Sequence, residues 1–351
     1  MWTAGLAELS EAAGRSPKGA RAAALLPTHA ASELKLLARL ERVLRQIPAG
    51  APLDLAGAAS ALLDAGGKRV RPLMLLLSAR AAAAGGRAQG RTALALCSEL
   101  VHSASLLHDD VIDDGLTRRG LPAPRVRYGN SVSVIAGDWL LTASLTLASR
   151  SRVPGAVEAL VRALHSLVEG EAVQLRLRGS TRFTVAQSMQ VSRGKTGSLF
   201  AFCGEAGALA ARAAPEVVSA LREFGLHAGT AFQIADDLLD VEGDAAALGK
   251  AVLADAAEGK PSLPLAVALD RDPGLRDDLA RLLREEEAGQ AQEGRAAALA
   301  AAMKSLGALD EARRIAEAER ALSRQALRTL PSSRTRDLLE VVAGALVSRQ
   351  S

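Results

Sequence analysis

The chain has 351 residues, which suffices for one large domain or two ordinary ones and is too long for a small module held together by disulfides. Its 43 Lys and Arg against 39 Asp and Glu leave a net charge of +4, too weak a field for coating nucleic acid. With two Trp, one Tyr and five Phe, it also lacks the aromatic side chains on which single-stranded bases stack. A globular protein without a nucleic-acid partner is therefore expected.

The N-terminal stretch, residues 1–30, is rich in Ala and Gly without a clear period, so we expect a loosely ordered arm. Charged side chains interrupt it, which leaves no continuous apolar run of the kind found in secretory signals. The two cysteines, Cys97 and Cys203, have no CxxC spacing and are expected as buried free thiols in a reducing compartment. These features predict a cytoplasmic protein.

The remainder, residues 31–351, is expected to form a single all-α domain. Ala, Leu, Arg and Glu dominate it, and alternating runs of β-branched and aromatic residues are almost absent. Apolar residues at three- and four-residue steps predict core-facing helices over residues 34–44, 94–106 and 157–164. Clusters of Gly and Pro separate the helical stretches, but none is strong enough to divide the domain.

Two further stretches have a less regular composition. Residues 132–149 are about as apolar as a short membrane-spanning helix, but Asp138 lies inside them and Ser and Thr dilute them. We therefore expect a buried core helix there and no integral membrane segment. The charged stretch 271–294 is expected to form a solvated helix face and loop.

A DDxxD pattern occurs twice, in LLHDDVIDD and in FQIADDLLD, each time with apolar flanks. Its aspartates are Asp109, Asp110 and Asp113 in the first copy, and Asp236, Asp237 and Asp240 in the second. On a helix, positions i, i+1 and i+4 lie within one face, so each copy is expected to project three carboxylates in the same direction. Carboxylates crowded at the edge of an apolar interior repel one another unless cations neutralise them. Oxygen ligands favour Mg²⁺ or Mn²⁺ over zinc, and Mg²⁺ usually binds through a few carboxylates plus substrate phosphates.

Basic side chains recur beside glycines along the same chain. They lie in GGKRVRP at 66–72, RRG at 118–120, GKTG at 194–197, GK at 249–250 and GKP at 259–261. Any one of these groups alone is ordinary surface charge. Together they supply guanidinium forks and ammonium groups for diphosphates, next to sites suited to Mg²⁺.

From about Leu34 onward, this ordered set of motifs resembles the trans-isoprenyl diphosphate synthases, the polyprenyl synthetase family. The resemblance includes GEAVQ at 170–174, GKTGSLF after it, and GKPSLP near the second acidic copy. It implies one large antiparallel helical bundle around a central cavity, commonly a homodimer. It also implies a Mg²⁺-dependent prenyl transfer, in which isopentenyl diphosphate is joined head-to-tail to an allylic diphosphate.

The resemblance implies a role for each matched position. The residues expected to hold the metal ions are Asp109, Asp113 and Asp236, with Asp110, Asp237 and Asp240 in support. Those expected to grip the allylic diphosphate are Arg118, Lys195, Lys250 and Lys260. Those expected to bind the diphosphate of isopentenyl diphosphate are Lys68, Arg71, His102 and Arg119. Thr196 and Gln233 are expected to line the reacting carbons, and His108 to support its neighbouring aspartates rather than act as a base.

The chemistry implied is loss of diphosphate from the allylic substrate, attack of the isopentenyl double bond on the resulting cation, and loss of a proton. Positive charge stabilises the leaving group in a cavity from which water is excluded. The departing diphosphate is the expected base.

The growing chain is expected to run along the helix that carries the first DDxxD, where one turn of about 5.4 Å matches roughly one isoprene unit. The positions that would gauge it are Ser105, Ala104, Val101, Ser98 and Cys97. In short-chain members of the family, a bulky aromatic lies four or five residues before the motif, whereas Ala104 and Ser105 are small. We therefore expect a product longer than farnesyl and, among such products, a long polyprenyl diphosphate such as the precursor of a quinone side chain, with geranylgeranyl diphosphate as the alternative.

Two other functions compete with this one. A class I terpene cyclase also uses acidic motifs with Mg²⁺, but it lacks a dedicated isopentenyl diphosphate site such as GGKRVRP with His102 and Arg119 would provide. A non-catalytic partner subunit would have lost aspartates from the motifs, and this chain retains them all. Activity of the purified chain alone would distinguish a synthase from such a partner subunit.

Overall fold

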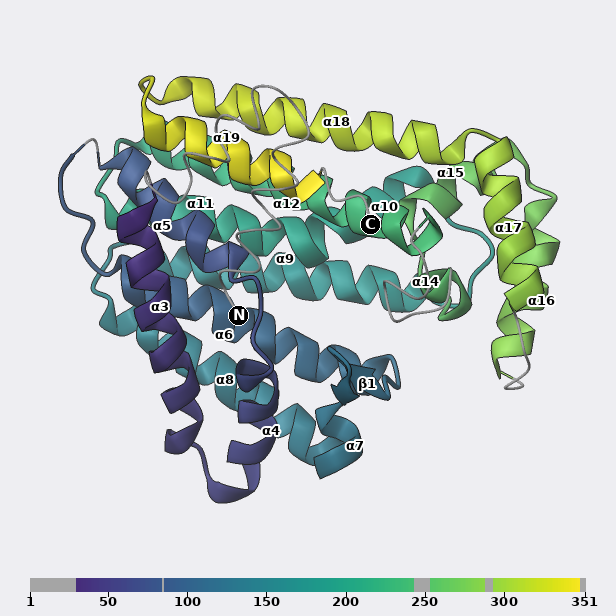
Figure 1. Cartoon of the computed structure of the whole chain (residues 1–351), viewed down its shortest axis with the longest axis horizontal. Helices are drawn as coiled ribbons and strands as arrows, with labels where there is room; N and C mark the ends of the chain where they lie inside the picture. The colour runs from purple at the N-terminus through teal and green to yellow at the C-terminus, as the bar shows by residue number, and fades with distance from the viewer. Residues whose placement is uncertain (1–29, 84, 243–252, 288–292, 348–351) are drawn as a thin grey trace.

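The computed structural model describes residues 30–83, 85–242, 253–287 and 293–347, and it is almost entirely helical (Figure 1). The first part contains α3 (Ala31–Gln46), the 3₁₀ turn η1 (Ile47–Gly50), α4 (Leu53–Asp64), α5 (Val70–Ala82), α6 (Arg91–Ile112), β1 (Thr117–Arg118), β2 (Leu121–Pro122), α7 (Pro124–Tyr128), α8 (Asn130–Arg150) and α9 (Ala156–Leu177). The second part contains α10 (Val185–Val191), the π-helical turn η2 (Ser192–Gly197), α11 (Ser198–Ala210), α12 (Pro215–Glu242), α14 (Ala254–Ala257), α15 (Leu263–Arg271), α16 (Leu275–Glu287), α17 (Glu293–Ser305), α18 (Ala308–Ala326), η3 (Leu327–Thr329) and α19 (Arg334–Val347).

The all-α prediction is confirmed, with one small addition. Strands β1 and β2 pair antiparallel, with Thr117 opposite Pro122, and form a short hairpin after α6. This hairpin falls within the Gly- and Pro-rich break expected after the first acidic motif. The predicted arm lies almost wholly outside the described residues.

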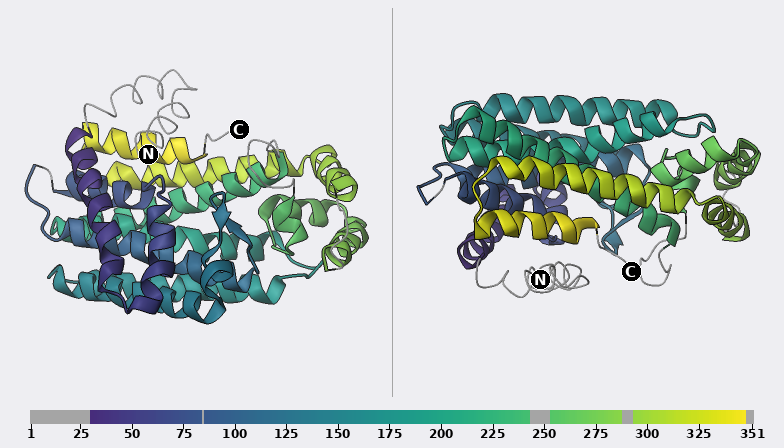
Figure 2. Two further views of the ribbon diagram at one scale, coloured as in Figure 1. Left: turned by 60° about the horizontal axis from the view of Figure 1, so that its bottom comes forward. Right: turned by 90° about the horizontal axis from the view of Figure 1, so that it is seen from above.

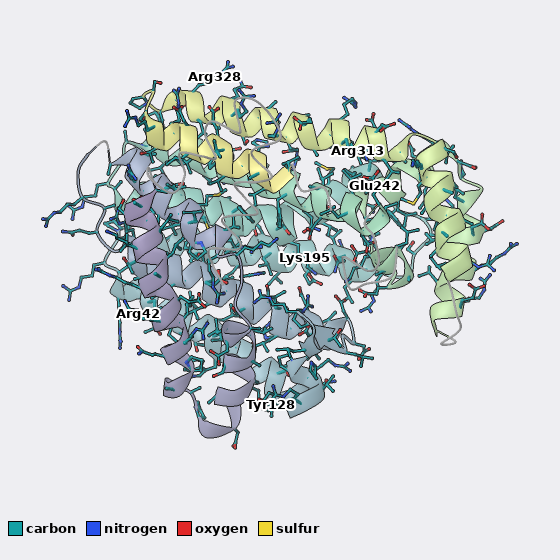
Figure 3. All side chains as sticks on the ribbon, in the orientation of Figure 1. Arg42, Tyr128, Lys195, Glu242, Arg313 and Arg328 are labelled. Atoms are coloured by element: carbon teal, nitrogen blue, oxygen red, sulfur yellow. The ribbon has the colours of Figure 1, made fainter. Side chains whose placement is uncertain are left out.

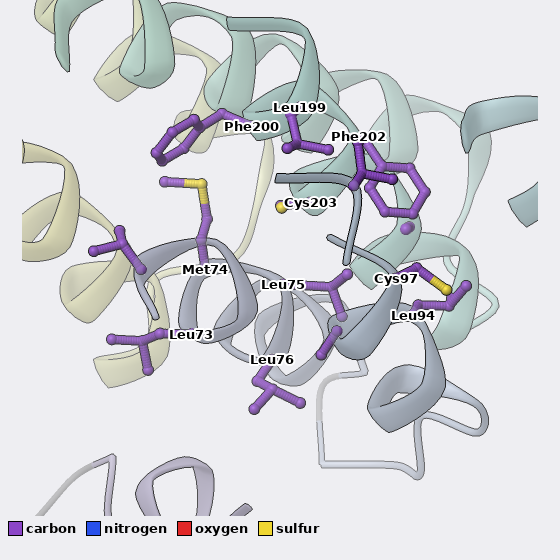
Figure 4. Packing of buried hydrophobic residues seen from close by; sticks show 14 of the residues in the cluster. Leu73, Met74, Leu75, Leu76, Leu94, Cys97, Leu199, Phe200, Phe202 and Cys203 are labelled. Atoms are coloured by element: carbon purple, nitrogen blue, oxygen red, sulfur yellow. The ribbon is translucent and has the colours of Figure 1, made fainter. Parts of the chain in front are cut away.

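The long helices stack in layers, with α18 and α19 side by side on one face and α16 and α17 at one end (Figure 2). Helix α11 lies at the centre and packs on α5, α6, α9 and α12. Its Phe200 and Phe202 belong to the same buried core cluster as Leu75 of α5 and Cys97 of α6, and Figure 4 shows the Phe200 ring beside Met74 of α5. Burial keeps both cysteines as free thiols and raises the pKa of each to about 12, so they behave as apolar core groups.

Helices α11 and α12 approach closely because glycines face each other's backbones. A Cβ on Gly204 would overlap the carbonyl oxygen of Leu221, and one on Gly225 would overlap that of Phe200. No larger residue fits these crossings without moving a helix. The crossings therefore fix α12, which carries the second acidic motif, against the central helix.

Helix α8 corrects one expectation. Its inner face, which includes Ala136, Leu140 and Ser144, is buried, and the helix packs along α6. Its outer face exposes Val134 and Ile135, so α8 is a surface helix of the bundle rather than a fully buried one. By length and composition alone α8 could cross a membrane, since its most apolar window has a mean hydropathy of 1.4, but core helices of globular proteins share this property.

Candidate active site

One cavity of about 750 Å³ opens between the C-terminal half of α6, the turn before α5, η2, α12 and the loop that precedes α15. Most of the side chains singled out in the sequence line it. They are Lys68, Arg71, His102, Ser105, Asp109, Asp113, Arg118, Arg119, Lys195, Thr196, Gln233, Asp236, Asp237 and Lys260. Figure 3 shows Lys195 near the middle of the molecule, far from labelled surface residues such as Arg42 and Arg328. Lys250 lies outside the described residues.

The first acidic motif ends α6 and presents two carboxylates to the cavity. Asp109 and Asp113, one helical turn apart, line it, whereas Asp110 is turned away and fully buried. Asp110 accepts a hydrogen bond of 2.9 Å from Arg118 Nε. Burial raises the pKa of Asp109 to about 6, and the neighbouring carboxylates of Glu171 and Asp113 add to the shift against the opposing effect of Lys195.

The second motif lies in the last turns of α12. Asp236 and Asp237 line the cavity, whereas Asp240 lies outside the lining and accepts a hydrogen bond of 3.2 Å from the backbone N–H of Asp255. Asp237 accepts hydrogen bonds from Gln233 Nε2 at 2.9 Å and from the backbone N–H of Leu263 at 3.0 Å. Burial nevertheless raises the pKa of Asp237 to about 7. Both motifs therefore place desolvated carboxylates at the negative ends of helix dipoles, where a cation stabilises them.

Two lysines lie among these carboxylates. Lys195 Nζ is 2.7 Å from Glu171 Oε2 and 3.5 Å from Asp109 Oδ2. Lys260 Nζ is 3.1 Å from Asp113 Oδ2 and also contacts Asp255 and Glu258. Burial works against their charged forms, but the adjacent carboxylates raise the pKa of both ammonium groups. Both lysines are therefore protonated at neutral pH.

Four further side chains of the cavity lining, Lys68, Arg71, His102 and Arg119, form the basic wall of the site. Arg71 stacks over the ring of Phe200, with its guanidinium carbon 4.9 Å from the ring centroid, and lies near His102 and Arg119. Burial, helped by these arginines, holds the pKa of His102 well below its usual value. A neutral His102 donates one hydrogen bond without adding charge to an already cationic wall.

The basic wall is built on a strained turn. Arg69 adopts a left-handed conformation with φ of 49°, and its buried guanidinium pairs with Glu99 and, at 2.8 Å, with Glu41. Glu99 lies one turn before His102 on α6, so the same carboxylate also attracts Arg71 and Arg119 electrostatically. This ion-pair cluster holds the Lys68–Arg71 segment against α6.

The turn η2 connects Thr196 and Gln233, which are expected to line the reacting carbons, with the second acidic motif. Thr196 Oγ1 donates to Gln233 Oε1 at 2.6 Å, and Gln233 in turn donates to Asp237. On the other side of the turn, Gly194 meets Gly170 of α9, where a Cβ on Gly170 would lie 2.7 Å from the backbone nitrogen of Lys195. This close crossing places Glu171 beside Lys195.

The positions expected to gauge product length divide into two groups. Ser105 lines the cavity, together with the apolar side chains of Leu106 and Phe232. The others are fully or almost fully buried in the packed core and do not line it; they are Ala104, Val101, Ser98 and Cys97. Cys97 Sγ contacts the carbonyl oxygen of Ser144 at 3.1 Å, so this side of α6 faces α8.

Several charged residues contact the site that the sequence motifs do not predict. Glu171 lies in the GEAVQ stretch, which signalled the family but not this contact with Lys195. Arg178, at the end of α9, donates to the carbonyl oxygen of Ile112 at 2.6 Å and lies 3.3 Å from Asp113. No short motif marks Glu99 or Arg178, because their partners are distant in sequence. His108 was expected to support its neighbouring aspartates, but the structure turns it toward α8, where its Nε2 lies 3.1 Å from the carbonyl oxygen of Val134 and 3.3 Å from Asp138.

The donor set fits a hard divalent cation that brings part of its own coordination shell. The cavity offers carboxylate oxygens, two of them with raised pKa values. Among the described residues, no three His, Cys, Asp or Glu side chains converge closely enough to hold an ion by themselves. This arrangement suits Mg²⁺, which takes remaining ligands from water and substrate phosphates.

Comparison with known sequences agrees with this geometry. The family described as polyprenyl synthetase matches residues 53–301. The chain is 33% identical over 288 residues to the octaprenyl diphosphate synthase of Escherichia coli, covering 82% of this chain and 88% of that protein. It is 36% identical to an all-trans-nonaprenyl-diphosphate synthase of Rhodobacter capsulatus, covering 79% and 84%. It is 32% identical to a short chain isoprenyl diphosphate synthase of Methanothermobacter thermautotrophicus, covering 88% and 95%.

Solved structures give the same answer for the fold. A polyprenyl synthase from Caulobacter crescentus, complexed with calcium and isoprenyl diphosphate, superimposes with a TM-score of 0.83 at 34% identity. The match covers 93% of this chain and 97% of that one. By sequence, fold and arrangement of the cavity, the chain belongs to the polyprenyl synthetase family of trans-isoprenyl diphosphate synthases.

Proposed function

We propose that this protein condenses isopentenyl diphosphate head-to-tail with an allylic diphosphate and releases a linear trans-polyprenyl diphosphate longer than farnesyl diphosphate. The observation that carries the proposal is that one cavity is lined by two acidic motifs with their lysines and also by a second set of basic side chains, the basic wall. Two diphosphates would thus bind at different places with their hydrocarbon parts between them.

The allylic diphosphate is assigned to the acidic side. Lys195, Lys260 and Arg118 would contact its oxygens, and Lys250 is proposed to join them. Asp109, Asp113 and Asp236 would hold Mg²⁺, with Asp237 beside them. Asp110 supports this side through Arg118, and Asp240 supports it through the backbone of Asp255. A bound Mg²⁺ would supply positive charge to the departing diphosphate. The related Caulobacter structure, which is complexed with calcium and isoprenyl diphosphate, supports a site that takes a divalent cation and a diphosphate.

Isopentenyl diphosphate is assigned to the basic wall. Lys68, Arg71 and Arg119 neutralise its diphosphate, and a neutral His102 donates a hydrogen bond. Thr196 and Gln233, already joined by a hydrogen bond, line the space between the two substrates. The allylic C–O bond breaks, the isopentenyl double bond forms the new C–C bond, and the released diphosphate accepts the proton. Protein groups replace water around the cation and prevent its conversion to an alcohol.

The proposed product length rests on small side chains and on relatives. Ser105 leaves the α6 side of the cavity open, and Ala104 beside it is also small. The octaprenyl and nonaprenyl diphosphate synthases among the relatives support a long product. A short chain synthase is similar at 32% identity, so geranylgeranyl diphosphate is retained as the alternative product.

We also propose a cytoplasmic homodimer. The exposed apolar side chains of α8 and α9, which include Ile135, Val168 and Leu175, support an interface in which a second copy covers them. The buried free thiols fit a reducing compartment. Light scattering is expected to give the mass of two chains, and Val168→Asp to give one chain; a monomeric parent protein would refute the dimer.

The test of the reaction is incubation of the purified chain with isopentenyl diphosphate, Mg²⁺ and, in separate reactions, dimethylallyl, geranyl, farnesyl or geranylgeranyl diphosphate. Mass analysis is expected to show elongated linear diphosphates that disappear with EDTA and in the Asp236→Asn variant. Cyclised hydrocarbons would indicate a terpene cyclase instead. No product from the folded chain alone would indicate a subunit that needs a partner.

A further inference from the structure

A buried ion-pair network lies behind the π-helical turn η2, on the side away from the cavity. Its centre is Glu319 of α18, whose side chain is 5% exposed. One carboxylate oxygen accepts a hydrogen bond from Arg193 at 2.7 Å, and the other lies 2.5 Å from His227 Nδ1. Three elements, η2, α12 and α18, therefore meet at one carboxylate.

This carboxylate depends on its partners. Removing an ionised side chain from water is costly unless hydrogen bonds and opposite charge compensate. Burial alone would raise the pKa of Glu319, but the hydrogen bonds from His227 and Arg193 hold it below its usual value. Arg193 is itself half exposed and could be solvated by water. Its ordered position against α18 is therefore explained by Glu319 rather than by its own burial.

The geometry of η2 connects this network to the cavity. Arg193 and Lys195 lie on one short π-helical turn but make contacts in opposite directions, Arg193 with α18 and Lys195 with Asp109 and Glu171. A π-helical turn is rare and is retained mostly at functional sites. The next residue, Thr196, hydrogen-bonds Gln233 on α12, the helix that also carries His227.

We propose that Glu319 is a positioning residue for the allylic side of the site. Through Arg193 it holds η2 in the orientation in which Lys195 and Thr196 face the cavity, and through His227 it fixes the same turn relative to α12. This inference rests on the proposed function, because it assigns Lys195 to the allylic diphosphate. Within the described part of the chain, Glu319 pairs with Arg193 and His227, neither of which belongs to the basic wall assigned to isopentenyl diphosphate.

The experiment measures both substrates separately in Glu319→Gln and Arg193→Gln. Glu317→Gln is the matched control, since Glu317 lies on the same helix and pairs with Arg320 at the surface. Loss of one charge-assisted contact is expected to raise the KM for geranyl diphosphate about tenfold in either test variant. The KM for isopentenyl diphosphate is expected to stay within about twofold, as are both KM values in the control.

Rescue and folding checks separate positioning from general damage. Arg193→Lys keeps the charge and is expected to recover most of the affinity for geranyl diphosphate. If Glu319→Gln fails to fold, Arg193→Gln decides the matter alone, because its side chain is half exposed. Equal changes in both KM values, or no change in either test variant, would overturn the proposal.

Calorimetric titration of each variant with geranyl diphosphate, and separately with isopentenyl diphosphate, needs no turnover. A parent protein that binds both substrates but joins neither would refute the proposed reaction. The same titrations would still support positioning if the variants lose affinity for geranyl diphosphate alone, and would refute it if both affinities fall together.

Discussion

Replacing Ser105 with Phe is expected to shorten the product to farnesyl diphosphate. Ser105 lines the cavity and lies four residues before Asp109 on α6. At a rise of 1.5 Å per residue, the new ring would lie about 6 Å along the helix axis from Asp109. An aromatic side chain there would close the path of a tail that runs along α6.

The substitution is expected to leave the fold and the first condensation intact. The Ser105 hydroxyl donates to the carbonyl oxygen of His102 at 2.9 Å, and losing that bond costs about 1 kcal/mol. Turnover of geranyl diphosphate to the first product should therefore stay within about twofold of the parent rate. Ser105→Ala, which loses the same hydroxyl without adding bulk, is the control and should retain the long product.

The assay is mass analysis of the dephosphorylated products after extended incubation with excess isopentenyl diphosphate. Ala104→Phe is a second probe, but Ala104 is fully buried, so overpacking is expected to cost about 1–3 kcal/mol and lower the melting temperature as well. If both Phe variants fold and make products of the parent length, the tail does not follow α6, and the argument from small side chains fails.

Three further predictions concern packing, protons and the basic wall. Gly204→Ala is expected to destabilise the fold by about 3 kcal/mol, because the added methyl group overlaps the backbone of Leu221. Urea unfolding measures this loss. Unchanged stability would mean that α11 and α12 can move apart at little cost. Protons compete with Mg²⁺ for Asp109 and Asp237, whose pKa values are raised to about 6 and about 7. The affinity of the protein for Mg²⁺ with inorganic pyrophosphate is therefore expected to rise with pH across that window. Calorimetry that records no release of protons on binding would contradict this. Arg71→Lys removes the stacking of the guanidinium on Phe200. In steady-state kinetics it is expected to raise the KM for isopentenyl diphosphate about tenfold and to leave the KM for geranyl diphosphate unchanged. The reverse pattern would mean that the two assigned sites must be exchanged.

The helical fold and most of the cavity lining could be predicted from the sequence because helix periodicity and ordered motifs are local signals. The orientation of the Asp110 side chain could not be predicted from the sequence. An adjacent position on a helix points about 100° away, and Arg118 on the following hairpin decides where that carboxylate goes. The contacts of Glu99 and Arg178 could not be predicted for a related reason, because the fold alone brings Glu99 next to Arg69 and Arg178 next to Asp113.

The prediction of a buried helix at residues 132–149 was wrong because composition indicates how apolar a helix is, and not how many neighbouring helices cover it. Helix α8 packs along α6 on one side, and Ile135 remains exposed on the other. The same sequence is compatible with a helix buried on all sides. Only the arrangement of the neighbouring helices decides between the two.

The lysines among the aspartates have a consequence for how substrate enters. Lys195 and Lys260 act as tethered counterions, which pair with Asp109 and Asp113 before any ligand arrives. A diphosphate with its own cations would offer each lysine a phosphate oxygen, and the cations would pair with the carboxylates. Binding would then be an exchange of partners. The buried carboxylates would pass from one counterion to another without being left uncompensated.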